Sequence, residues 1–244
     1  MPFISSVSSK FAYGKPPRVP ASQPAAVGGS LRFTASSTSG ISIPNDIDLR
    51  MGTGDFTIEW FQYQLATSGT NYQRLFSMGS YPSASFGVSL EDTDSSRRFY
   101  AWISSVTSSF TTIGAAENML NTWIHYAMCR SGSTFRLFKN GTQLGSNISN
   151  STNFTDATNN LVIGNETSRS AIAAFNGYIT NFHWVKGTAL YTANFTRPTA
   201  PITRVANTML LLNATTSGTA FTDSSVKGKV ATGTGVAWNA LSPF

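Results

Sequence analysis

Apolar and polar residues alternate in several short stretches of this chain, and this pattern predicts β-strands that place one face in a core. The stretch 55–63 alternates throughout. One side of it carries Phe56, Ile58, Trp60 and Gln62, and the other carries Thr57, Glu59, Phe61 and Tyr63. Further strands are expected at 31–33, 40–44, 74–78, 86–90, 99–103, 123–130, 134–139, 161–165 and 208–213, with a final ribbon over 226–238. We find no long helical periodicity, so the pattern predicts an all-β domain of about a dozen strands.

The stretch from Phe175 to Pro198 joins a strand to an aromatic loop. Strict alternation in the strand places Tyr178, Phe182 and Trp184 on one side and Ile179, Asn181 and His183 on the other. The loop 189–195 carries Leu190, Tyr191 and Phe195, whose exposure to water would be unfavourable. We therefore expect this loop to pack back onto the domain as a lid that closes one end of a β-sandwich.

Three polar stretches between predicted strands are interpreted as turns or loops. Asn140-Gly141 is a type I′ hairpin signal, since both residues tolerate a positive φ, and 147–160 reads as a polar loop. The acidic residues Glu91, Asp92 and Asp94 are followed directly by Arg97 and Arg98 and are expected at a hairpin tip. Three carboxylates could hold Ca²⁺, but the spacing differs from an EF-hand loop and the arginines could neutralise the site. We therefore expect no cofactor, with Ca²⁺ at these carboxylates as the alternative.

Composition narrows the class of protein. The chain has 244 residues, 11% of them charged and 12% aromatic, which suits one large domain of short strands joined by polar turns. Cys129 is the only cysteine, so no intrachain disulfide can form, and we expect this thiol to be buried packing. No apolar stretch approaches the roughly 18 residues of a membrane-spanning helix, and the N-terminal residues lack a signal-peptide pattern.

The net charge of +6 is concentrated near the N-terminus. Lys10, Lys15, Arg18 and Arg32 precede the first acidic residue, Asp46, and the rest of the chain has no basic run. We therefore do not expect nucleic acid as a partner.

Residues 1–29 are rich in proline and are predicted to form an extended arm, and the domain is predicted to span 30–244. Apolar and basic residues are interleaved along the arm: Phe3, Ile4, Lys10, Phe11, Tyr13, Lys15 and Arg18. Such a segment is expected to order on a neighbouring subunit, and the alternative is a flexible tail.

Several motifs, in order, resemble one known family. They are GTGDFTIEW at 52–60, NTWIHYAMCRSGSTFRLFKNG at 121–141 and LVIGN at 161–165, together with the 175–198 stretch. They resemble the laminin-G-like, concanavalin A-like lectin/glucanase domains found in structural proteins of phages and large algal viruses. The resemblance implies a two-sheet antiparallel β-sandwich of the jelly-roll type over 30–244, behind the N-terminal arm.

Enzymatic chemistry is not expected. Glucanases with this fold carry a motif that resembles E-x-D-x-x-E on one strand, because a retaining mechanism needs two carboxylates close together. This chain contains no such motif. Zinc-protease, phosphate-loop and nucleophile-elbow motifs are absent as well. Glu59 and His125 each lie on a predicted strand, and we interpret both as partnered framework residues.

The resemblance therefore suggests a non-enzymatic virion structural protein, associated with the capsid or the tail. It would be assembled from the host cytoplasm and would bind other virion proteins or further copies of itself. The alternative is a glycan-binding, lectin-like module at an extracellular surface, which mediates attachment to a host or a surface. Its candidate contacts are Tyr81, Tyr100, Trp102, Asn165 and Ser168, because sugars stack on exposed aromatic rings and bond to polar loop ends.

Overall fold

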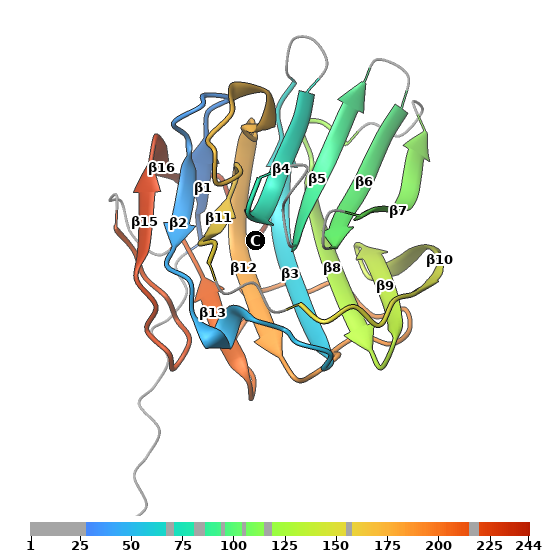
Figure 1. Ribbon diagram of the computed structural model, residues 1–244. Coiled ribbons are helices and arrows are strands. Elements are labelled where there is room, and N and C mark those ends of the chain that lie inside the picture. The colour runs from blue at the N-terminus through green and yellow to red at the C-terminus, as the bar shows by residue number, and fades with distance from the viewer. Residues whose placement is uncertain are drawn as a thin grey trace, which may run out of the picture.

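Two antiparallel β-sheets pack face to face in a computed structural model of the chain (Figure 1). The structure describes residues 28–66, 71–80, 86–93, 96–103, 106–114, 119–154, 158–214 and 220–244. The first sheet has the order β10 (Thr142–Ser149), β9 (Thr134–Lys139), β8 (Trp123–Ser131), β3 (Phe56–Gln64), β12 (Gly177–Lys186), β1 (Ser30–Phe33) and β16 (Val236–Asn239), and β13 (Thr208–Leu212) also pairs with β12.

The second sheet lies in front of the first in Figure 1. Its order is β14 (Ala220–Phe221), β15 (Ala231–Thr234), β2 (Gly40–Ile43), β11 (Leu161–Ile163), β4 (Asn71–Met78), β5 (Phe86–Thr93), β6 (Ser96–Ile103) and β7 (Val106–Gly114). Two short 3-10 helices, η1 (Ile47–Leu49) and η2 (Ala171–Ala173), are found among the described residues. The predicted fold class, an all-β two-sheet antiparallel sandwich, is confirmed.

Three strands were not predicted: β7, β10 and β14. β10 extends into the stretch expected to be a polar loop from residue 147, and this expectation is wrong up to Ser149. Most side chains of β10 are exposed or half-buried, so the strand shows no apolar alternation that the sequence could reveal.

The core lies between the sheets, and the predicted phase of β3 is confirmed. Phe56, Ile58 and Trp60 are fully buried there. The Trp60 ring lies 5.8 Å from the Phe76 ring of the opposite sheet, and its Nε1 donates to Gln62 Oε1 at 2.9 Å. Gln62 therefore shares the core face and gives the tryptophan the polar partner that a buried indole requires.

The unbroken alternation predicted for β12 is wrong because the strand contains a bulge. The register shifts between Thr180 and His183, and Asn181 adopts a left-handed conformation with φ 54°. The extra residue inverts the alternation, so Ile179 joins Phe182 and Trp184 in the core. Tyr178 instead contacts Tyr63 on the outer face, with 5.8 Å between the ring centroids.

The segment between β12 and β13, residues 187–207, covers the outer face of the first sheet, and we call it the cover segment. Tyr191 and Phe195 stack with their centroids 3.6 Å apart and pack with Phe138 over Cys129, which is fully buried. The expectation that this loop packs back is confirmed. The expectation that it closes one end of the sandwich is wrong, since its aromatic rings lie on a sheet face.

The β9–β10 turn holds this segment in place. Asn140 and Gly141 have φ values of 50° and 84°, as the hairpin signal predicts. A Cβ atom at Gly141 would collide with the carbonyl oxygen of Phe195, and the Phe195 amide donates to the Gly141 carbonyl at 2.8 Å. Glycine is therefore required here both for its conformation and for the close approach.

The arm predicted at 1–29 lies outside the described residues except for its last two positions, Gly28 and Gly29. Its role as a partner-binding segment stays a prediction. Among the described residues, no helix has the length and apolar character needed to cross a membrane.

Candidate functional site

Two groups of polar side chains could carry chemistry, and the first is buried under the cover segment. Glu59 on β3 lies 2.7 Å from His183 Nδ1 through Oε1 and 3.0 Å from His125 Nε2 through Oε2. The Tyr191 hydroxyl of the cover segment donates to the same Oε2 at 3.0 Å. Glu59, His125 and His183 are buried on the outer face of the first sheet.

The hydrogen bonds around His183 indicate its tautomer. Thr208 Oγ1 accepts from the Val205 amide at 2.9 Å and lies 2.8 Å from His183 Nε2. An ionised carboxylate can only accept, so His183 carries a proton on Nδ1 directed at Glu59, and the Thr208 hydroxyl bonds to Nε2. Nδ1 of His125 has no hydrogen-bond partner in the part of the chain that the structure describes.

This cluster links the first sheet to the cover segment through the hydrogen bond from Tyr191 to Glu59. Burial by itself would raise the pKa of Glu59, but the hydrogen bonds from His125 and His183 outweigh it and lower this pKa to about 2. Burial, together with the same carboxylate, raises the pKa of Tyr191, so the tyrosine keeps the proton that it donates. Glu59 is only 1% exposed, so its carboxylate is shielded from solvent.

The second group surrounds an open cleft of about 450 Å³ at the start of β13. One wall is the end of the cover segment with Thr208 and Met209, and the other is the turn at Val226 and Lys227. Its lining residues are Arg204, Val205, Ala206, Asn207, Thr208, Met209, Val226 and Lys227. Val205 and Val226 are 42% and 75% exposed, so apolar surface is open to solvent at this cleft.

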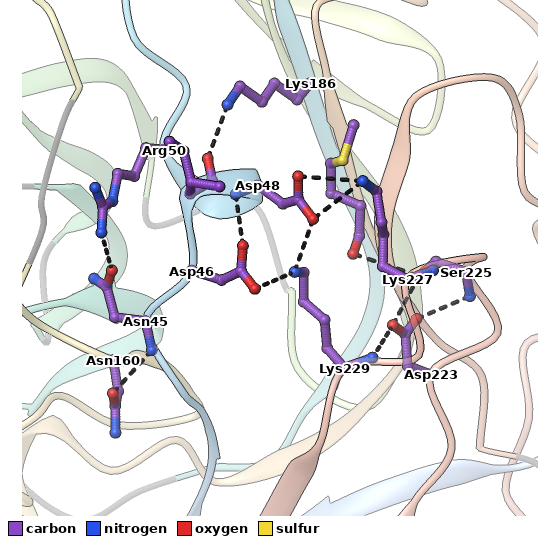
Figure 2. A network of polar contacts seen from close by, with 12 residues as sticks. Asn45, Asp46, Asp48, Arg50, Asn160, Lys186, Asp223, Ser225, Lys227 and Lys229 are labelled. Atoms are coloured by element: carbon purple, nitrogen blue, oxygen red, sulfur yellow. Dashed lines mark hydrogen bonds and ion pairs between the residues drawn. The ribbon is translucent and has the colours of Figure 1, made fainter.

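A polar network fixes the turn that carries Lys227 (Figure 2). Asp223 anchors it, because Oδ1 accepts from the amides of Leu211 and Ser225 at 2.9 Å, and Oδ2 accepts from the Lys229 amide at 2.7 Å. The Lys229 ammonium then bridges Asp46 and Asp48, at 3.1 and 3.2 Å. The loop around η1 is thereby tied to the segment that leads into β15.

Lys227 is bound more loosely than Lys229. Its Nζ lies 3.2 Å from Asp48 Oδ2, and its side chain is 38% exposed, against 6% for Lys229. The pKa of Asp46 is lowered by a hydrogen bond from the Asp48 amide and by Lys229. Burial opposes the lowering at Asp48, but hydrogen bonds from Lys229 and Lys227 prevail. Both aspartates are therefore charged at neutral pH, and each has a lysine partner.

The acidic stretch predicted as a hairpin tip belongs largely to a strand. Glu91 and Asp92 are in β5, where the register pairs them with Arg98 and Arg97, while Asp94 lies outside the described residues. No group of three metal-ligating side chains is found where the structure describes the chain. The expectation that the protein needs no metal stays a prediction.

The predicted glycan contacts fall on different elements. Tyr100 and Trp102 are in β6, opposite Ser89 and Gly87 in the register, and Tyr81 lies outside the described residues. Asn165 is buried, and its amide donates to the carbonyls of Ser37 and Ser39, so the framework uses it.

Ser168 is exposed, and its hydroxyl donates to Glu166 Oε1 at 2.9 Å. Neither Asn165 nor Ser168 lines the cleft. Sequence reasoning missed the cleft because its walls are two loops, which are brought together by folding and carry no motif.

The solved structures that resemble this chain share its fold. A candidate carbohydrate-binding protein from Bacteroides ovatus matches with a TM-score of 0.65 and 13% identity, over 89% of this chain and 61% of that one. The heptameric SAP-like pentraxin of Limulus polyphemus matches with a TM-score of 0.53 and 13% identity, over 68% of this chain and 78% of that one. The extracellular region of zebrafish Gpr126/Adgrg6 matches with a TM-score of 0.51 and 14% identity, over 84% of this chain and 26% of that one.

These likenesses show the class of fold, a two-sheet antiparallel β-sandwich. Residues 35–191 match the laminin G group of the concanavalin A-like lectin/glucanases superfamily, and the chain belongs to this family. The chain spans 61% of the length of the Bacteroides protein, so the likeness does not extend over that whole protein. No curated protein sequence matches the chain.

Proposed function

We propose that this chain is a non-enzymatic glycan-binding domain and that the cleft between residues 204–209 and the turn at Val226 and Lys227 is its binding site. The observation that carries the proposal is the cleft itself, in which exposed apolar side chains stand beside hydrogen-bonding groups. A sugar ring offers C–H faces and hydroxyls, so it needs both kinds of surface. The fold shared with a candidate carbohydrate-binding protein of Bacteroides ovatus supports this reading.

The absence of enzymatic activity is part of the proposal. Glycoside hydrolysis requires two carboxyl groups on opposite sides of the scissile bond, about 5–9.5 Å apart. The described residues that line the cleft include no carboxylate, and Glu59 lies sealed under the cover segment. The domain is therefore expected to hold a glycan without cleaving it.

The test fills the cleft without disturbing the core. Val226→Trp places a large side chain at the cleft wall, while Val230→Trp changes a residue that is 70% exposed and does not line the cleft. We expect the unchanged chain and Val230→Trp to be retained on the same immobilised glycans, and Val226→Trp to lose retention at an unchanged melting temperature. Retention of Val226→Trp would place the binding elsewhere, and no retention of the unchanged chain on a broad glycan panel would refute the function.

The virion role suggested by the sequence resemblance remains a second hypothesis. It depends on the arm, whose residues 1–27 the structure does not describe. Deletion of 1–29 should leave the melting temperature of the sandwich nearly unchanged and abolish incorporation into particles. Normal incorporation of the shortened chain would remove this hypothesis.

A further inference from the structure

We propose that the cleft selects an anionic sugar and that Arg204 and Lys227 hold its carboxylate or sulfate group. This inference rests on the proposed function and makes its ligand class specific. Two of the lining side chains are cationic, and none of the described residues that line the cleft is acidic. An anionic group would complement the positive charge of these two side chains, whereas a neutral saccharide would not.

Lys227 can turn to a ligand because Lys229 also pairs with Asp48. Lys227 Nζ lies 3.2 Å from Asp48 Oδ2 and donates to Oδ1 at 3.3 Å, and Lys229 Nζ lies 3.2 Å from the same Oδ2 (Figure 2). When Lys227 moves to a ligand anion, Asp48 keeps the well-buried ammonium of Lys229 as its partner. The exchange thus leaves no carboxylate without a partner, which is the main cost of breaking an ion pair.

The nearby acidic groups do not compete for the ligand position. Asp223 accepts from three backbone amides and from the Ser225 hydroxyl, and Asp46 accepts from the Asp48 amide and pairs with Lys229. On the other side of the cleft, Arg204 Nη1 donates to the Ser224 carbonyl at 3.5 Å. The planar N–H fork of a guanidinium matches the oxygens of a carboxylate or sulfate.

The remaining walls suit the rest of a sugar ring. Val205 and Val226 present apolar surface for ring C–H groups, and Asn207 offers an amide at the same cleft. The volume of about 450 Å³ falls within the range of small-ligand sites, roughly 300–1,000 Å³. The geometry therefore fits a saccharide unit whose anionic group is directed at the two basic side chains.

The experiment compares ligands that differ only in charge, with the full chain and titration calorimetry in low salt. The probes are tetragalacturonic acid, its methyl ester, a sulfated galactan oligosaccharide and its desulfated form. We expect the acid and the sulfated form to bind about tenfold or more tightly than their neutral counterparts, with affinity falling as salt rises. Comparison of the affinities for the two charged probes shows whether the cleft prefers a carboxylate or a sulfate group.

Lys227→Gln and Arg204→Gln should each reduce affinity for the charged probe about tenfold and leave the neutral probe unaffected. Lys186→Gln is the matched control, because Lys186 bonds to the Ile47 carbonyl in the same region but does not line the cleft. Melting curves confirm that each variant is folded.

Three results would overturn the inference: equal affinity for charged and neutral probes, unchanged affinity in both cleft variants, or an equal loss in Lys186→Gln. Any of these with a neutral glycan still bound at the cleft leaves the proposed function intact. Binding of none of the four probes counts against the anionic ligand, and the broad glycan panel then decides the proposed function separately.

Discussion

Glu59 is a buried carboxylate whose charge is stabilised by three donors, and this makes stability depend on pH. The pKa of Glu59 is lowered from 4.5 to about 2 in the folded chain. A carboxyl group whose folded pKa is depressed contributes stability above its unfolded pKa and loses that contribution as pH falls through the folded value. The contribution, about 3 kcal/mol in order of magnitude, is therefore complete above about pH 5 and disappears between about pH 4.5 and pH 2.

The first prediction follows from the lowered pKa of Glu59. Glu59→Gln removes the charge and leaves one donor unpaired, so it should lower the free energy of unfolding by roughly 3–5 kcal/mol at pH 7. Chemical denaturation from pH 7 to pH 2 measures the difference from the unchanged chain. The gap should shrink below about pH 4.5. A gap that is constant with pH would show that Glu59 is not the group that titrates.

A second prediction tests which residues of β12 face the core. Ile179→Ala removes a side chain that is 2% exposed in the main core and should lower the free energy of unfolding by about 2–5 kcal/mol. Ile172→Ala makes the same change at a residue 58% exposed and should cost less than about 0.5 kcal/mol. Equal costs in urea melts would mean that the bulge is misplaced.

Residue patterns predicted the faces of uninterrupted strands well and failed where the backbone departs from regularity. Alternation in β3 placed Trp60 in the core, because nothing interrupts that strand. In β12 the bulge at Asn181, which has a left-handed conformation, adds one residue to the strand. Such a bulge cannot be recognised from the two-residue alternation of apolar and polar positions. The partners of Glu59 were also out of reach, since His183 lies 124 positions away and only the sheet register brings it near.

At the scale of elements, the β9–β10 turn and the cover segment depend on one another. In Gly141→Ala, alanine must adopt a positive φ and its Cβ collides with the Phe195 carbonyl. Gly132 also has a positive φ, 60°, but a Cβ at this position meets open space. The conformational cost, about 1–2 kcal/mol, is common to both. We expect Gly141→Ala to melt lower than Gly132→Ala and to be cut faster by protease within residues 187–207. Equal proteolysis would show that the turn does not hold the cover segment.

The candidate site shows why elements alone do not predict function. The aromatic loop was recognised from sequence because exposed Tyr191 and Phe195 would be unfavourable, although the surface that it covers could not be inferred. The cleft had no such signal. Arg204 and Lys227 are isolated basic residues in two loops, and they share a cleft only because β13 pairs with β12 and the Asp223 turn folds back on β13.

At the scale of the whole molecule, one lysine links segments that are far apart in the sequence. Lys229 precedes β15 in the second sheet, and it binds Asp46 and Asp48 beside η1, which leads into β3 of the first sheet. This contact also leaves Lys227 available at the cleft, because it supplies Asp48 with a second cation. In our proposal, stability and ligand binding are therefore coupled through Asp48, which both lysines contact.

The last prediction separates these two contributions. Lys229→Met removes a well-buried ammonium that serves two carboxylates and should lower the free energy of unfolding by about 1–3 kcal/mol. Lys227→Met removes a more exposed ion pair and should cost only about 0.2–1 kcal/mol. The pKa values of Asp46 and Asp48 are lowered in the folded chain, so the effect of Lys229→Met should diminish as pH falls below their ordinary value of 3.8.

Binding should follow a different order from stability. In Lys229→Met, Asp48 keeps Lys227 as its only lysine partner, so releasing Lys227 to a ligand leaves that carboxylate unpaired. Lys229→Met should therefore weaken binding of the charged oligosaccharide although Lys229 does not line the cleft, and neutral probes should be unaffected. Urea melts and calorimetry on both variants measure the two effects. Unchanged affinity in Lys229→Met would show that Lys227 binds the ligand without leaving Asp48, or that it takes no part.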